Sequence, residues 1–271
     1  MPLYRKEDAS GLVLPVETRT TAIDDDYVFM IDSTTNIPYR ITKADLLAGL
    51  TSGTTGGTGG SGGTGNTWNG TVVFKSLFDS TPPVDIAANN TISLIGTAAI
   101  DSSTTLLSGS TLFTGSSGYA SIPNKSEYNF GGSDFTIDFF VKFNSVNAGT
   151  IVNKYGGSQS NSSFVFQINS GNTLGTYFYY SGSNYLGITD IPVTVNTLYY
   201  VAVKRVGDTI SLWVNGVMNG SANIGTNTIN ATTANILIGS EPGGSYYGNF
   251  RMDNFRITIG GDNDLSIIPT A

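Results

Sequence analysis

The sequence contains no histidine and no cysteine. These absences exclude Ser-His-Asp and Cys-His catalysis, zinc sites built from imidazole or thiolate ligands, and disulfide bonds. Charged residues are also scarce, at 12% of the chain, and acidic residues outnumber basic ones by 20 to 13. The resulting net charge of −7 opposes neutralisation of a phosphate backbone, so we expect no nucleic-acid partner.

Long hydrophobic runs are missing as well. No stretch of 18 consecutive apolar residues occurs, so we expect no insertion into a membrane. The first residues, MPLYRKEDASG, lack the apolar core of a secretion signal, and we expect synthesis in a cytoplasm.

Glycine, by contrast, is abundant and concentrated in residues 51–70, which hold nine glycines and no charged residue. Glycine loses more backbone entropy on folding than other residues, and Gly/Ser/Thr tracts bury little apolar surface. This segment is therefore predicted to be a flexible linker whose ends lie roughly 25 Å apart. It divides the chain into an N-terminal segment, residues 1–50, and a larger domain, residues 71–271.

The N-terminal segment carries a few short predicted elements. A strand is expected at 27–31, a return strand at 39–41, and a short helix at 42–49 with Thr42 as its N-cap. Elements this short do not close a core unless metals, disulfides or association support them. Since cysteine and histidine are absent, we predict that residues 1–50 dock on a partner or self-associate.

Beyond residue 71 the hydrophobic pattern alternates with period two, which indicates strands buried on one face. The clearest alternating stretches are 135–143, 164–168, 201–203, 210–214 and 255–259. Asn215-Gly216 lies between two apolar runs and predicts a tight hairpin, because a type I′ turn needs positive φ at both positions. Many short strands without a convincing helix predict an all-β sandwich.

An ordered series of segments in this domain resembles a known family. The segments are Leu77–Asp79, Ile92–Gly96, Leu112–Pro123, Gly132–Val141, Leu212–Gly216 and Gly248–Ile257. Together they resemble the laminin-G-like, concanavalin A-like lectin/glucanase domains found in phage virion proteins. The resemblance implies a jelly-roll sandwich of two sheets, a fold that commonly binds glycans.

The stretches Ile23–Asp32 and Arg40–Leu47 resemble the N-terminal part of phage fibre, spike or capsid-decoration proteins. This resemblance implies that residues 1–50 attach to other virion proteins and that the sandwich projects from the particle surface. It also implies a homo-oligomer such as a trimer, although the sequence shows no coiled-coil heptads. The expected function is adhesion to host-surface polysaccharide by a head-fibre, decoration or tail-fibre subunit. A purely architectural cement protein and a glycan depolymerase are the alternatives.

The depolymerase alternative requires paired carboxylates. The glucanases of this superfamily carry Glu-x-Asp-x-x-Glu on one strand, and this motif is absent. Asp134 and Asp138 lie four residues apart on one predicted strand, which separates them by roughly 13 Å. Glycosidase pairs lie about 5–9.5 Å apart. We therefore expect both aspartates to be solvated-face or loop-end residues and the protein not to be an enzyme, with a general acid from elsewhere left open.

Three tyrosines are candidate carbohydrate-binding residues, because aromatic faces stack on sugar rings. Tyr246 and Tyr247 lie in a glycine-rich loop, and Tyr185 belongs to a cluster with Tyr177, Tyr179 and Tyr180. The alternative is that these tyrosines are ordinary strand residues, each half buried.

One aspartate is a candidate ligand for a structural calcium ion, the one cofactor we consider. Asp253 matches the acidic position of the closing motif in related sandwiches and shares strand parity with Phe255 and Ile257, so we expect it to face inward. A buried carboxylate needs compensation. Calcium, Arg251 or Arg256, or backbone N–H groups could supply it.

Overall fold

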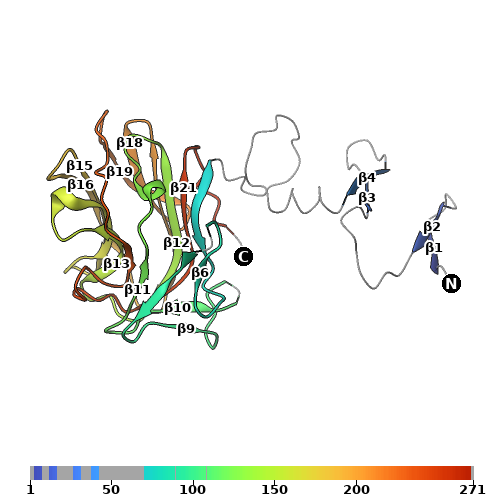
Figure 1. Cartoon of the computed structure of the whole chain (residues 1–271), viewed down its shortest axis with the longest axis horizontal. Helices are drawn as coiled ribbons and strands as arrows, with labels where there is room; N and C mark the ends of the chain where they lie inside the picture. The colour runs from blue at the N-terminus through green and yellow to red at the C-terminus, as the bar shows by residue number, and fades with distance from the viewer. Residues whose placement is uncertain are drawn as a thin grey trace. The chain divides into compact units, whose positions relative to one another are not determined.

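The computed structural model describes residues 70–88, 90–107 and 109–269, together with the backbone of four strands nearer the N-terminus. The chain separates into two compact units, residues 1–57 and 58–271 (Figure 1). Apart from Gly70, the predicted linker 51–70 lies outside the described residues. The predicted boundaries at 50 and 71 and the flexibility of the tract therefore stay predictions.

The first unit contains two antiparallel hairpins, which pair β1 with β2 and β3 with β4. Their bounds are β1 Leu3–Glu7, β2 Leu12–Val16, β3 Tyr27–Ile31 and β4 Pro38–Thr42. The strands predicted at 27–31 and 39–41 are confirmed, whereas the β1–β2 hairpin was not predicted. Thr42 is the last residue of β4, and the rest of the predicted helix, residues 43–49, lies outside the described residues.

The second unit is built from strands, and two 3-10 turns are its helices among the described residues. The bounds are β5 Thr71–Ser76, β6 Val84–Asp85, β7 Asn90–Thr91, β8 Ser93–Ile95, β9 Ala99–Asp101, β10 Thr111–Phe113, β11 Tyr119–Ile122, η1 Ser126–Tyr128, β12 Phe135–Phe143, β13 Gly149–Tyr155, η2 Gln159–Asn161, β14 Ser162–Ile168, β15 Thr173–Tyr180, β16 Asn184–Pro192, β17 Leu198–Val206, β18 Thr209–Val214, β19 Val217–Asn223, β20 Ile236–Ile238 and β21 Phe250–Ile259. The predicted all-β class is confirmed.

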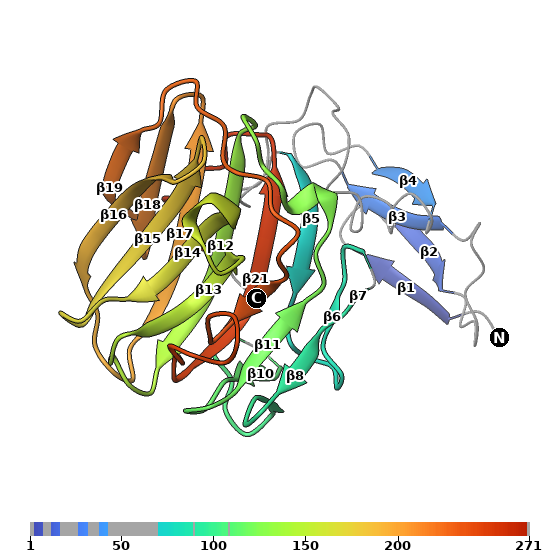
Figure 2. The same ribbon diagram turned by 60° about the vertical axis from the view of Figure 1, so that its left-hand side comes forward.

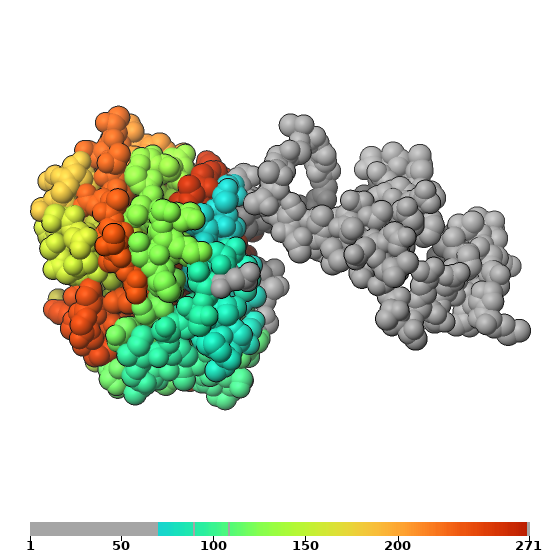
Figure 3. All heavy atoms as spheres, viewed as in Figure 1, coloured from blue at the N-terminus to red at the C-terminus, as the bar shows by residue number. Residues whose placement is uncertain are grey.

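Two large antiparallel sheets form this unit and stack face to face (Figures 1 and 2). One has eight strands in the order β19-β18-β17-β12-β21-β10-β9, with β5 also paired to β21. The other has seven strands in the order β16-β15-β14-β13-β20-β11-β8. Strand β20, from late in the chain, lies between β13 and β11. Figure 3 shows this order on the surface, where an orange band separates yellow-green from green residues. The fold is therefore the predicted jelly-roll sandwich.

Phenylalanines from the alternating strands fill the space between the two sheets. Phe139 of β12 meets Phe166 of β14 edge to face with ring centroids 5.4 Å apart, and Phe135 of β12 lies 5.4 Å from Phe178 of β15. All four side chains are fully buried. Burying a side chain of this size stabilises a fold by roughly 1.5–3 kcal/mol, so these inter-sheet contacts are a main source of stability.

The predicted hairpin after β18 is also present. Asn215 and Gly216 have φ of 52° and 79°, and they connect the paired strands β18 and β19. Both residues occupy the left-handed region that Asn and Gly tolerate best, which explains why this dipeptide marks the turn.

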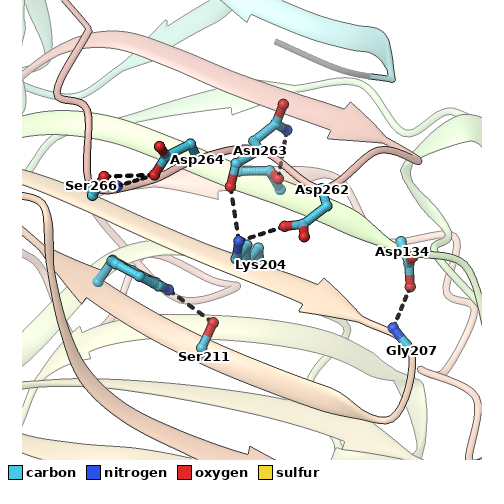
Figure 4. Close-up of polar contacts among 10 residues, drawn as sticks. Asp134, Lys204, Gly207, Ser211, Asp262, Asn263, Asp264 and Ser266 are labelled. Carbon is cyan, nitrogen blue, oxygen red and sulfur yellow. Dashed lines mark hydrogen bonds and ion pairs between the residues drawn. The ribbon is translucent and has the colours of Figure 1, made fainter. Parts of the chain in front are cut away.

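Residues 260–269, which follow β21, pack on the outer face of the eight-stranded sheet over β12 and β17. Leu265 is fully buried there against Phe140 and Tyr200. Lys204 of β17 forms an ion pair with Asp262 and donates a hydrogen bond of 2.9 Å to the backbone oxygen of Asn263 (Figure 4). This segment thus buries part of the outer face over β12 and β17.

Asp138 also lies on that outer face, and the expectation that it is solvated is wrong. Its carboxylate is fully buried and accepts two hydrogen bonds from the Arg256 guanidinium, of 3.0 and 2.9 Å. The reason is that β12 is a central strand and its outward side chains are covered by neighbours, including Tyr200. Asp134, just before β12, accepts a hydrogen bond of 2.8 Å from the Gly207 backbone N–H. Both aspartates therefore have structural contacts.

Candidate functional site

The outer face of the seven-stranded sheet carries a group of tyrosines. On β15, Leu174, Thr176 and Phe178 are buried, so the alternating residues Tyr177 and Tyr179 face outward. Tyr185 of β16 is opposite Tyr179 in the strand register and is 55% exposed. Tyr155, at the end of β13, is the fourth member. We call Tyr155, Tyr177, Tyr179 and Tyr185 the tyrosine face.

The four rings form a continuous series. Ring centroids lie 6.1 Å apart for Tyr177 and Tyr185, 6.2 Å for Tyr185 and Tyr179, and 6.2 Å for Tyr179 and Tyr155. Each pair is tilted by 47–57°, so the rings present their faces and edges to one another without stacking flat. Partly exposed aromatic rings at this spacing form a surface suited to the apolar faces of sugar rings.

A pocket of about 360 Å³ continues this surface across the sheet. Tyr155 forms part of its wall, together with Tyr119 of β11 and Leu237 of β20. Polar groups are supplied by Ser121 and Asn235, whose side chains are hydrogen bonded to each other at 3.1 Å. Pockets that combine aromatic walls with a few oriented polar groups are typical small-ligand sites.

Two carboxylates lie beside the tyrosine face, Asp190 near Tyr177 and Glu241 near Tyr179. Partial burial raises the pKa of the Glu241 carboxyl, and no second carboxylate contributes to that rise. Burial is the main cause that raises the pKa of Tyr179 to about 12, and electrostatic interactions with Tyr155 and Glu241 add to this rise. Burial also raises the pKa of Tyr177, so these two hydroxyls are neutral donors and acceptors near neutral pH.

The structure separates the three predicted carbohydrate-binding tyrosines. Tyr185 lies in the tyrosine face, whereas Tyr246 and Tyr247 lie in the loop before β21. Tyr246 is 64% exposed, and the backbone N–H of Thr150 donates a hydrogen bond of 2.8 Å to its backbone oxygen. Among the described residues, neither Tyr246 nor Tyr247 makes a ring contact with the four tyrosines.

Tyr155 was not predicted as a site residue, and neither was Glu241. Each is distant in sequence from the Tyr177–Tyr185 cluster and joins it only because β13 and the loop after β20 lie close to β15 in the folded sheet. A single sequence carries no direct signal for that order of strands.

Asp253 is buried as predicted, but its expected parity is wrong. Met252 belongs to the main core, whereas Asp253 is opposite Phe140, whose side chain lies on the outer face of the eight-stranded sheet. Asn254, with φ of 48°, accompanies a bulge here, so Phe255 faces the core again. The inserted residue reverses the alternation on which the prediction depended.

The surroundings of Asp253 bear on the calcium prediction. Burial raises the pKa of its carboxyl to about 6, while hydrogen bonds from the backbone N–H groups of Asn254 and Leu107 lower it and the nearby Asp79 raises it. In the part of the chain that the structure describes, no group of three or more acidic side chains is placed to share a metal ion. Backbone N–H groups thus provide compensation, and a calcium ion there remains a prediction.

The same described residues include no helix long and apolar enough to cross a membrane.

Comparison with known proteins agrees with this architecture. A sequence profile of the concanavalin A-like lectin/glucanases superfamily matches residues 114–258. This span includes β11 to β20 and most of β21, and hence the whole tyrosine face. None of the curated proteins compared with the chain is significantly similar to it.

Several solved structures share the fold. The binding domain of Paraclostridial Mosquitocidal Protein 1 is 16% identical with a TM-score of 0.58, over 72% of this chain and 50% of that one. The receptor binding domain of botulinum neurotoxin D is 15% identical with a TM-score of 0.56, over 72% of this chain and 50% of that one. The botulinum neurotoxin serotype D ligand binding domain, solved in complex with N-acetylneuraminic acid, is 14% identical with a TM-score of 0.56, over 72% and 49%. The chain thus spans about half the length of these structures, and the likeness shows the fold alone.

Proposed function

Because the chain belongs to the concanavalin A-like lectin/glucanases superfamily, we propose that its sandwich binds glycan through the tyrosine face. The observation that carries this proposal is the continuous series of four outward-facing rings, with centroid spacings of 6.1–6.2 Å, on the outer face of the seven-stranded sheet. On the opposite face of the sandwich, residues 260–269 pack over part of the central strands β12 and β17.

The proposed activity is binding without hydrolysis. Glycosidases need two carboxylates, one of which is held protonated by its environment. Glu241 has a raised pKa, but burial alone accounts for it, and no partner carboxylate acts on it. Asp138, one of the two carboxylates considered from sequence, is fully buried in a bidentate pair with Arg256. These contacts favour a lectin over a depolymerase.

The proposed setting is the surface of a phage particle. Residues 1–50, which resemble the attachment segments of fibre and decoration proteins, would bind other virion proteins as a homo-oligomer, and the glycine-rich tract would give the sandwich reach. Many copies on one particle would convert weak single-site contacts with host-surface polysaccharide into firm attachment. Exposure of the aromatic side chain of Tyr185 supports recognition over a purely architectural cement role.

The binding proposal is tested with two tyrosines of similar exposure. Tyr185→Ala should reduce the binding of the full chain to an array of host-surface and reference polysaccharides, because it removes a ring from the series. Tyr246→Ala is the matched control, since this exposed ring makes no contact with the four rings of the tyrosine face. Equal loss in both variants, or no loss in Tyr185→Ala, would contradict the assignment of the site.

The attachment proposal has its own test. Deleting residues 1–50 should leave the melting transition of the sandwich in place and abolish incorporation into particles. Continued incorporation would show that the attachment site lies elsewhere in the chain.

A further inference from the structure

The tyrosine face combines partly exposed rings with an absence of basic side chains on the outer face of its sheet strands. We infer, on the basis of the proposed glycan binding, that its ligand is an extended and uncharged glycan chain, and that Tyr177 is a stacking platform held flat on the sheet by two glycines. Charge distribution, ring spacing and the space around Tyr177 each support this inference.

The seven strands of this sheet contain a single basic residue, Lys154 of β13. Its side chain is fully buried and points into the sandwich, where its ammonium donates hydrogen bonds of 2.7 Å to Asn129 Oδ1 and 2.6 Å to the Thr232 backbone oxygen. Lys125 follows β11 in the chain, and its charge interacts with the carboxylate of Glu127 two residues later. The outer face of the sheet strands therefore offers no cation for a sugar carboxylate, sulfate or phosphate.

The charges that do lie beside the rings are negative. Glu241 acts on Tyr179, and Asp190 of β16 acts on Tyr177. An acidic sugar would be placed next to these carboxylates without a compensating cation, which disfavours binding. A neutral sugar meets no such repulsion, and its hydroxyls can donate hydrogen bonds to the carboxylates.

Ring spacing favours a chain over a single sugar. The rings of Tyr185, Tyr179 and Tyr155 follow one another with centroids 6.2 Å apart, so together they present more aromatic surface than one sugar ring can cover. Tyr155 then forms a wall of the pocket that also contains Tyr119. Successive sugars of one chain can thus contact successive rings from β16 to β11.

Two glycines leave room for Tyr177. Gly187 is opposite Tyr177 in the strand register, and a Cβ atom there would lie 3.0 and 3.1 Å from two ring carbons of Tyr177. A Cβ atom on Gly175 would lie 3.5 Å from the same ring and 2.7 Å from Asn169 Nδ2. Neither glycine has positive φ, so the backbone does not require glycine at these positions. Their missing side chains instead let the ring lie across the neighbouring strand, with Tyr177 Oη donating to Asn169 Oδ1 at 3.2 Å.

The test measures binding of the full chain to soluble oligosaccharides by calorimetry. The panel contains one- to six-unit oligomers of glucose, mannose, galactose and N-acetylglucosamine, the galacturonic acid hexamer as the acidic counterpart of the galactose hexamer, and lactose with and without terminal N-acetylneuraminic acid. A neutral hexamer should bind at least roughly tenfold more tightly than its monosaccharide, which corresponds to about 1.4 kcal/mol. Each acidic compound should bind more weakly than its neutral counterpart.

Gly187→Ala should weaken hexamer binding by roughly tenfold, because the added methyl group displaces the Tyr177 ring. Gly171→Ala is the matched control. Gly171 lies in the exposed β14–β15 turn, where no atom is closer than 3.9 Å to the added Cβ, so the affinity of this variant for the hexamer should be unchanged. Tyr177→Ala replaces Gly187→Ala if the latter does not fold.

Tighter binding of the acidic compounds, equal affinity for monomer and hexamer, or unchanged affinity in the Tyr177 and Gly187 variants would overturn the inference while leaving glycan binding intact. Failure of every compound to bind would overturn the proposed function as well.

Discussion

The ion pair between Asp138 and Arg256 provides a sharp test of the claim that the eight-stranded sheet is structural. Asp138 is fully buried, Arg256 is 6% exposed, and two hydrogen bonds of 2.9 and 3.0 Å join the two side chains. Arg256→Met leaves the carboxylate buried without the guanidinium. Breaking a buried pair in this way costs roughly 3–5 kcal/mol. A domain of this size changes its melting temperature by about 2–4 °C per kcal/mol, so we expect a decrease of about 6–20 °C.

The double variant Asp138→Leu/Arg256→Met distinguishes this explanation from simple loss of packing. It removes both charges together, and well-packed apolar residues often replace a buried ion pair at little cost. We therefore expect the double variant to melt above Arg256→Met in calorimetric scans of the full chain. The reasoning would be refuted by a single variant within about 1 kcal/mol of the native protein, or by a double variant as unstable as the single one. Glycan affinity measured below the transition should be the same in all three proteins.

Three further predictions concern other parts of the chain. The pKa of Asp253 is about 6 in the folded protein and ordinarily 3.8, so the stability that this group contributes decreases as pH rises between these values. Asp253→Asn should remove that decrease when the free energy of unfolding is measured by urea titration at several pH values. A calcium-induced rise in the melting temperature of the native protein that the variant lacks would instead indicate a bound ion. Burial lowers the pKa of Lys154 from 10.5 to about 8 in the folded protein. Between these two pH values the unfolded chain binds the proton more tightly than the folded chain, so the free energy of unfolding increases with pH. Lys154→Met should abolish this increase in the same urea titrations. Deleting half of residues 51–70 should leave the melting temperature of the sandwich nearly unchanged, and a large decrease would show that the tract is packed structure.

The alternation of apolar residues was sufficient to predict the strands that cross the core. Phe135–Phe143 and Phe255–Ile259 were recognised because every second side chain faces the phenylalanine-rich interior. Three-residue strands such as β9 and β20 carry too few residues for a period to be seen. The bulge at Asn254 is likewise invisible in the pattern, because one inserted residue reverses parity without altering composition.

The candidate site was predictable only in part, for a related reason. Tyr185 was selected because three other tyrosines lie nearby in sequence, and the structure places it among outward-facing rings. Tyr155 and Glu241 come from segments that the sequence keeps apart, and they meet through strand order, which depends on long-range pairing. The solvated position expected for Asp138 was wrong because a central strand in this fold is covered on both sides.

The distribution of charge separates the roles of the two sheets. Six of the basic residues described by the structure lie on strands of the eight-stranded sheet: Lys75, Lys142, Lys204, Arg205, Arg251 and Arg256. There they hold structural partners, as Lys204 holds residues 262–263 and Arg256 holds Asp138. The seven-stranded sheet keeps its one lysine inside and presents tyrosines outside. Since water solvates charge far better than aromatic faces, exposing rings where charges could stand has a cost in solubility. A surface that exposes rings over several strands despite this cost is suited to contact with a ligand. Its lack of cations favours a neutral ligand.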